Sequence, residues 1–143
     1  MKPASMLLLA LVATIARAET PTMRQLMLDL IHPASNEILL FIHRGGPQDE
    51  AEWARVRRSA LTLTESGYLL TKPGRAPKDI AVWTRDAEAL ASVGAAAYQA
   101  AQAKDFRALA ELAEPLDASC TNCHRQFRPT IFPRKGGTAG GEK

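Results

Sequence analysis

Residues 79–103 read DIAVWTRDAEALASVGAAAYQAAQA, and one apolar period runs through the whole stretch. Steps of three and four alternate between its apolar or small residues, which are Ile80, Trp83, Ala87, Leu90, Gly94, Ala97 and Ala101. Such alternation is typical of helices that pack at about 20° to a neighbour. Asp79 stands directly before the period, where an N-cap side chain is expected. We therefore predict a bundle helix over residues 79–103.

Small residues make up much of this period, and two interpretations are open. Ala87, Gly94, Ala97 and Ala101 would let a neighbouring helix approach closely, or they would leave room for a group that is not a side chain. An alanine-rich helix is the simpler explanation, because alanine has the highest helix propensity.

A similar period occupies residues 48–70. It consists of Trp53, Val56, Ala60, Leu63, Gly67 and Leu70. Residues 71–77, TKPGRAP, contain the proline and glycine that are typical of a loop. We predict a second helix over residues 48–70, joined by this loop to the helix at 79–103.

Two further apolar stripes lie toward the ends of the chain, and each contains a proline. Residues 22–43 carry Met23, Met27, Leu30, Ala34, Ile38 and Phe41, with Ile31 and Ile42 beside this stripe. Residues 105–128, with Asp105 as a suitable N-cap, carry Phe106, Leu109, Ala113, Leu116, Cys120, Cys123 and Phe127. Proline lacks an N–H and clashes with the carbonyl four residues back. We therefore expect a kink or a break at Pro33 and a bend at Pro115.

Four helices with short connections predict an all-α protein, an antiparallel up-down-up-down four-helix bundle. The sequence shows no convincing strand pattern. We assign the bundle to residues 19–130. Residues 131–143 are rich in glycine, proline and charge, so we expect a flexible C-terminal tail there.

Residues 1–18 have the pattern of a secretory signal peptide. Lys2 gives a positive start, residues 6–16 form an apolar run, and Ala16 and Ala18 suit cleavage after Ala18. The run is shorter than the roughly 20 residues that a membrane-spanning helix needs. We expect a periplasmic protein without stable membrane insertion after cleavage. An uncleaved anchor or a buried helix is the less favoured alternative.

The charge of the chain argues against a polyanion-binding protein. The net charge of +3 falls close to zero once Lys2 and Arg17 are removed, and the remaining basic residues are scattered among acidic ones. A nucleic-acid partner is therefore not expected. The sequence also contains no recognisable acid–base pair, nucleophile–base arrangement or phosphate-binding loop, so we do not expect an enzyme.

One motif carries chemistry, Cys120-Thr121-Asn122-Cys123-His124. Cys-x-x-Cys-His is the attachment signature of c-type haem. Residues three apart share a helix face, so both thiols can bond to one edge of a porphyrin. The imidazole of the next residue can then bind the iron. We predict one haem c, attached through Cys120 and Cys123 with His124 on the iron.

Three other interpretations of the two cysteines are weaker. A thioredoxin-like redox pair needs a βαβ context, which the sequence does not show. A zinc site needs four ligands, and the remaining histidines, His32 and His43, lie far upstream. A disulfide between Cys120 and Cys123 would close almost no loop and would add little stability.

With this motif near the end of the last predicted helix, the sequence resembles the class II c-type cytochromes, the cytochrome c′ family. The resemblance covers about residues 22–129, and its specific part is residues 120–128, where Phe127 and Arg128 follow His124. It implies a four-helix bundle with His124 as the proximal iron ligand and with Arg24 near the haem propionates. It also implies a possible homodimer formed through the first two helices.

A basic cluster follows the motif, and two roles are open for it. Arg125, Arg128, Arg134 and Lys135 could pair with the propionates or steer an acidic redox partner. A solvated basic helix end, favourable for the helix dipole, is the simpler explanation. We take Arg128 as a candidate cofactor-binding residue.

The resemblance divides function according to the distal ligand of the haem. A methionine gives a six-coordinate electron carrier, whereas an apolar side chain leaves five-coordinate iron that binds gases such as NO or CO. Met27 lies on the apolar stripe and is our tentative distal ligand, with Met23 as a minor substitute. The family's register, counted from Arg24, points instead to Leu28.

Other side chains near the predicted ring are weaker candidates. His32 and His43 are expected off the apolar stripe of the first helix, at the surface. Trp53 and Trp83 lie on helix seams, where they could pack against the porphyrin or within the core.

We therefore expect an exported monohaem c-type cytochrome that passes one electron through covalently bound haem iron to unidentified redox partner proteins. The first alternative is a five-coordinate protein that binds NO or CO at an open distal site. The second alternative is a helical module without haem whose cysteines form a disulfide.

Overall fold

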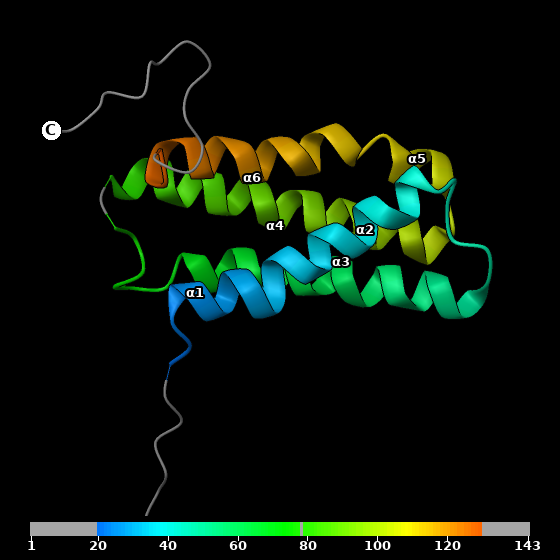
Figure 1. Cartoon of the computed structure of the whole chain (residues 1–143), viewed down its shortest axis with the longest axis horizontal. Coiled ribbons are helices and arrows are strands. Elements are labelled where there is room, and N and C mark those ends of the chain that lie inside the picture. The colour runs from blue at the N-terminus through cyan, green and yellow to red at the C-terminus, as the bar shows by residue number, and fades with distance from the viewer. Residues whose placement is uncertain (1–19, 78, 130–143) are drawn as a thin grey trace, which may run out of the picture.

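The computed structural model describes residues 20–77 and 79–129, and the described part contains helices and no strand. The predicted signal peptide, residues 1–18, and the predicted tail, residues 131–143, lie outside these ranges. Figure 1 shows the helical segments packed side by side, so the all-α prediction is confirmed. The segments are α1 (Met23–Gln25), the π-helical turn η1 (Leu26–Ile31), α2 (His32–His43), α3 (Glu50–Leu70), α4 (Ile80–Ala103), α5 (Phe106–Ala110) and α6 (Ala113–Phe127).

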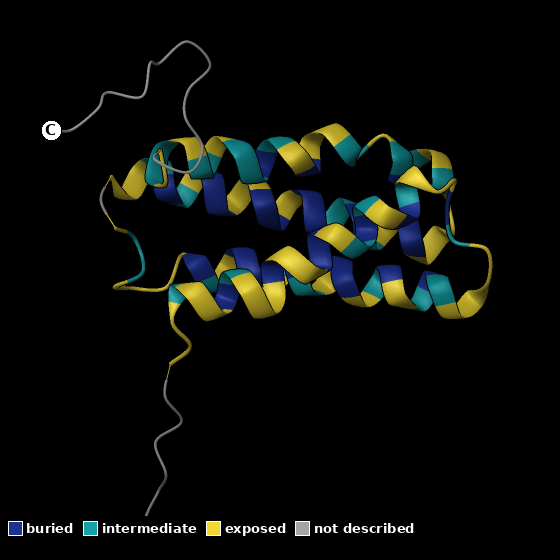
Figure 2. Cartoon of the chain, in the orientation of Figure 1, coloured by how far each residue is buried: buried dark blue, intermediate teal, exposed yellow. Residues whose placement is uncertain are grey.

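The helices α3 and α4 form the centre of the packing. They lie side by side in Figure 1, α6 lies along α4, and the run from α1 to α2 crosses α3 and ends beside α5. Figure 2 shows the buried positions of α3 and α4 turned toward the other helices. The predicted seam of α3 is confirmed, because all six of its residues are buried. On α4 the prediction fails at one position, since Ile80 is 73% exposed in the first turn of the helix.

The small residues of α4 serve close helix packing. A Cβ added at Gly94 would lie 2.7 Å from the backbone nitrogen of Thr64, and one at Gly67 would lie 2.8 Å from the carbonyl oxygen of Ala87. Side chains larger than hydrogen would therefore force α3 and α4 apart. Of the two interpretations open from sequence, close approach holds at this contact.

The helix caps follow the sequence predictions. The Asp79 side chain accepts a hydrogen bond from the Val82 N–H, and the Asp105 side chain accepts one from the Ala108 N–H. Thr22 and Gln25 form a capping box at the start of α1. Asp49 caps α3, so this helix begins two residues after the expected position.

Of the two outcomes expected at Pro33, a kink or a break, the break does not occur. The run is not broken at Pro33, because the residues before it keep helical dihedrals through the π-helical turn η1. In that turn the N–H of His32 donates to the carbonyl of Met27, five residues back. Pro33 has no N–H to donate to Asp29, so the wider turn lets the chain enter α2 without the usual bond.

The π-helical turn also shifts the apolar stripe by one residue. Leu30, expected on the buried stripe, is 37% exposed, whereas Leu26 and Ile31 are buried five residues apart. Five is the spacing of one π-helical turn. Beyond the turn the predicted stripe resumes with Ala34, Ile38 and Phe41.

The last predicted helix is divided rather than bent. It consists of α5 and α6, separated at Glu111 and Leu112. Pro115 lies in the first turn of α6, where its missing N–H has no partner within the helix. The proline ring would clash with the carbonyl of Glu111 in a continuous helix, which explains why α6 begins anew at Ala113.

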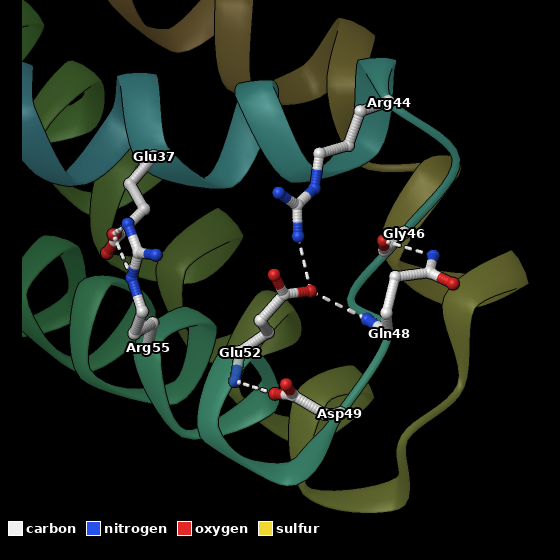
Figure 3. Close-up of polar contacts among 7 residues, drawn as sticks. All are labelled: Glu37, Arg44, Gly46, Gln48, Asp49, Glu52 and Arg55. Carbon is white, nitrogen blue, oxygen red and sulfur yellow. Dashed lines mark hydrogen bonds and ion pairs between the residues drawn. The ribbon is translucent and has the colours of Figure 1, made fainter.

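The end of the molecule where α2 turns into α3 is held by paired charges, which Figure 3 shows in close-up. Glu52 pairs with Arg44 and also accepts the backbone N–H of Gln48, at 2.7 Å. Across the same helix pair, Arg55 Nε lies 2.8 Å from Glu37 Oε1.

None of the helices in residues 20–77 and 79–129 has the length and apolarity of a membrane span.

Candidate functional site

The Cys-x-x-Cys-His motif lies on the last turns of α6. Cys120 and Cys123 are half-buried and carry free thiols, and Cys123 packs against the hydrophobic core. Their spacing of three residues places both on the same side of the helix. The thiols are therefore available on one face, and no disulfide joins them within the described structure.

The surroundings of both cysteines favour the protonated thiol. Burial raises the pKa of Cys120, opposed by a hydrogen bond from Ser119 and assisted by the Asp117 carboxylate. Burial also raises the pKa of Cys123 to about 11, and the negative charge of Asp86 adds to the effect. Both groups are thus held as thiols near neutral pH rather than as the thiolates that bind metal ions or exchange with disulfides.

His124 is held in the neutral form. Burial lowers its pKa, and the guanidinium of Arg128 lowers it further because it repels a second positive charge. A neutral imidazole has a lone pair on one nitrogen, which is the form that binds a metal. The site therefore combines two thiols and one neutral imidazole on consecutive turns.

A cavity of about 300 Å³ opens beside the motif, and we call it the motif cavity. Cys120, Cys123 and His124 line one side of it. The first helical run lines another side, with Met27 and Leu28 from η1 and His32 from α2. The helix α4 contributes a third side, with Trp83, Asp86, Ala87 and Leu90. The three motif residues and both predicted distal residues thus border one space.

A second hollow adjoins the motif cavity, at the end of the bundle where α3 leads into α4. The two share Met27, Leu28, Trp83, Cys123, His124 and Arg128. The second hollow adds Met23, Arg24, Arg75, Pro77 and Phe127. We call it the arginine hollow, because three guanidinium groups border it.

Trp83 forms a fixed wall between these spaces and the core. Its indole N–H donates to the carbonyl of Leu70 at 2.7 Å. The Phe127 ring meets it edge to face, with 5.0 Å between the ring centroids. Of the two tryptophans singled out in the sequence, Trp83 lines both hollows, whereas Trp53 is a buried residue of α3 that lines neither.

These residues fit a flat apolar ring that is attached at one edge. The thiols lie on one side, the neutral imidazole belongs to the same helix, and most of the surface that lines the cavity is apolar. One polar atom does not take part in this arrangement. Asp86 is 8% exposed, and its Oδ2 is buried without a hydrogen-bond partner, while Oδ1 accepts from Arg85.

The structure brings the alternative distal residues together rather than separating them. Met27 is half-buried and Leu28 is 52% exposed, and both line the two hollows. Met23 lines the arginine hollow and does not line the motif cavity. Which of them faces the ring stays a prediction.

The two upstream histidines have different positions. His43 is exposed at the end of α2 and lines neither hollow. His32 is exposed, as expected, but it also lines the motif cavity, with its ring 3.3 Å from Asn36 Nδ2. We expected His32 to lie off the side of Met27, and the π-helical turn explains the difference, since it places residues five apart on nearly the same face.

Two residues of the site were not predicted. Arg75 belongs to a stretch recognised only as a loop, and Asp86 resembles any polar residue next to a helix seam. The single available signal was the position of Asp86 directly before Ala87, on the border of the apolar period.

The described residues contain no group of three or more His, Cys, Asp or Glu side chains placed to hold a metal ion. Comparison of the chain with protein-family models, curated proteins and solved structures finds no match.

Proposed function

We propose that this protein is an exported monohaem c-type cytochrome that carries single electrons. The observation that supports the proposal is the motif cavity, which Cys120, Cys123 and His124 line together with Met27. The attachment signature alone is a sequence pattern. Attachment of haem also requires an apolar space beside the two thiols, and the thioether of Met27 on another wall can serve as a second iron ligand.

Each motif residue has a defined task in this proposal. Cys120 and Cys123 would hold the ring through thioethers, which would form by adding each S–H across one vinyl group, sulfur to one carbon and hydrogen to the other. His124 supplies its neutral nitrogen to the iron, and burial maintains that neutral form. When bound, haem iron supplies the one-electron redox couple. The walls formed by Trp83 and Leu90 exclude water from the ring.

We also infer the finer arrangement of the fold, an antiparallel up-down-up-down bundle. Gly67, late in α3, contacts Ala87, early in α4, whereas Gly94, later in α4, contacts Ala60, earlier in α3. This reversed order is expected of two helices that run in opposite directions.

Met27 is the proposed distal ligand, and Leu28 supports a second candidate function. If Leu28 faces the iron, the distal site is open and the protein binds NO or CO instead of carrying electrons. Leu28 lines the same cavity as Met27 and is adjacent to it in η1, which is the observation that favours this second candidate.

The proposal includes a periplasmic location, redox partner proteins and a homodimer. Export depends on the predicted signal peptide at residues 1–18. A homodimer through the first two long helices is supported by exposed leucines on both, Leu40 on α2 and Leu61 on α3.

Mass spectrometry and optical spectra of the exported protein test the proposal. We expect one added haem mass and low-spin bands that do not respond to CO. In a Met27→Ala variant we expect high-spin bands that shift with CO, whereas the matched control Met23→Ala keeps the low-spin spectrum. High-spin, CO-responsive bands in the unmodified protein would make gas binding the function. A mass without haem would refute both functions.

A further inference from the structure

Three arginines from three separate segments border the arginine hollow. Arg24 comes from α1, Arg75 from the loop between α3 and α4, and Arg128 from the end of α6. His124 borders the same hollow, and of the three arginines it is Arg128 whose charge acts on the proposed iron ligand.

None of these three guanidiniums takes part in an ion pair among residues 20–77 and 79–129. Elsewhere in this part of the chain, Arg44, Arg55, Arg57, Arg85 and Arg107 each pair with a carboxylate. Like charges around one hollow repel each other unless an anion lies between them. Convergent unpaired arginines are therefore a site for an anion, and the guanidinium fork suits carboxylates in particular.

Arg75 is the best-positioned of the three. It is half-buried, whereas Arg24 and Arg128 are exposed. The chain turns at Gly74, which has a φ of 81°. The backbone N–H of the next residue, Arg75, donates to the carbonyl oxygen of Lys72 at 3.2 Å. The Arg75 Nη1 also donates to the carbonyl of Pro21 at 3.1 Å, which ties the loop to the start of the first helical run.

We propose that Arg75, together with Arg24 and Arg128, binds the carboxylates of the haem, so that the loop between α3 and α4 is part of the cofactor site. This inference rests on the proposed function. The resemblance to a known family gave Arg24 a place near the propionates, and it gave no role to the loop. The connection between the two hollows supports the assignment, because Cys123, His124 and Trp83 line both, so that a group attached in the motif cavity would also border the arginine hollow.

A role for Arg75 in the redox couple follows from its charge. A carboxylate near the iron favours the ferric state, and a bound guanidinium offsets that negative charge. Removing the guanidinium leaves the carboxylate uncompensated. The reduction potential should therefore fall in a variant that has lost the charge at position 75.

The test measures the midpoint potential of the exported haem protein and of three variants. We expect Arg75→Gln to keep its attached haem and to lower the reduction equilibrium constant about tenfold, which is about 59 mV for a one-electron couple. Arg75→Lys should restore more than half of this shift. Arg107→Gln is the matched control, because Arg107 is 90% exposed and pairs with Glu111. We expect no change in its potential.

A second measurement on the unmodified protein covers the case in which Arg75→Gln does not mature. Phenylglyoxal reacts with accessible guanidinium groups, and mass mapping shows which arginines it modifies. We expect it to modify Arg58, an exposed arginine outside the ion pairs described, and to spare Arg24, which is also exposed but would be engaged by a carboxylate. Equal modification of both would overturn the anion site.

The remaining outcomes separate this inference from the proposed function. An unchanged potential in haem-loaded Arg75→Gln would overturn the inference and leave the cytochrome proposal intact. A protein without haem would refute both. A potential that responds to inorganic phosphate at constant ionic strength, and loses this response in Arg75→Gln, would overturn the haem carboxylate in favour of a free oxyanion.

Discussion

The two ends of the bundle use charge in opposite ways. At the end where α2 turns into α3, Glu37, Arg44, Glu52 and Arg55 are paired, as Figure 3 shows, and Glu50 pairs with both Arg57 and Lys104. At the end that carries the motif, Arg24, Arg75 and Arg128 surround a hollow, and no carboxylate in the described residues pairs with them. The first arrangement is complete within the chain, whereas for the second we propose a bound anion. The two ends therefore differ in whether their charged side chains form ion pairs with other described residues.

The largest effect should come from the motif end. In a Cys120→Ala, Cys123→Ala double variant we expect complete loss of covalently attached haem, because no thiol remains to form a thioether. Mass spectrometry of the exported protein after acid–acetone extraction measures the loss. Ser119→Ala, which changes the residue next to Cys120, is the control and should keep the haem mass. Haem that stays attached in the double variant would contradict the role of the motif.

A substitution in the core at the ion-paired end should act on stability instead. Phe41 is buried, and the guanidiniums of Arg44 and Arg55 lie over its ring, at 4.4 Å and 5.2 Å from the centroid. We expect Phe41→Ala to reduce the free energy of unfolding by about 3–5 kcal/mol, since it leaves a cavity. Urea unfolding measures this change. Ile80, which is 73% exposed, is the control, and Ile80→Ala should stay within about 0.5 kcal/mol.

The haem of Phe41→Ala should remain attached and keep the spectrum of the unmodified protein. A changed spectrum would show that the two ends do not act separately.

The smallest effect should come from an ion pair at the same end. Burial alone would raise the pKa of Glu37, but hydrogen bonds from Ser59 and Arg55 hold it below its usual value. A carboxylate with a lowered pKa stabilises the fold above its unfolded-state pKa and loses that contribution as the pH falls. Glu37→Gln should therefore flatten the loss of stability in acid, by less than about 1 kcal/mol.

Urea unfolding of Glu37→Gln at pH 7 and pH 4 measures this difference. Glu65→Gln is the control, because Glu65 is an exposed residue of α3 outside the ion pairs described. An acid response that is the same in Glu37→Gln and in the unmodified protein would show that the ion pair contributes nothing to the fold.

The sequence predicted the long helices well because each carries a strict apolar period and a capping side chain. Asp79 and Asp105 cap as expected, and the seam of α3 is buried throughout. The failures occur where local geometry departs from the α-helix. A period of 3.6 residues assumes one helix type, so the change of register at η1 could not be seen, and neither could the position of His32 on the motif cavity.

The candidate site could be predicted in part for a similar reason. Cys120, Cys123 and His124 form one continuous motif, and their placement on one helix follows from their spacing. Arg75 lies 45 or more positions away in a loop, and only the packing of the helices brings it near Arg128. The division of the last helix at Glu111 likewise depends on whether Pro115 falls in a first turn or in a helix interior, which the apolar period does not determine.

The π-helical turn has a consequence for insertions and deletions. A π turn contains one residue more than an α turn, so η1 amounts to one inserted residue accommodated inside a helix. Deleting a single residue between Leu28 and Ile31 would bring this turn to the α-helical count, rotate everything before it by about 100°, and place Pro33 against the carbonyl four residues back. Arg24 and Met27 would turn away from the motif while α2 stayed in place. The number of residues in η1 therefore determines which side chains of the first helical run line the two hollows beside the motif.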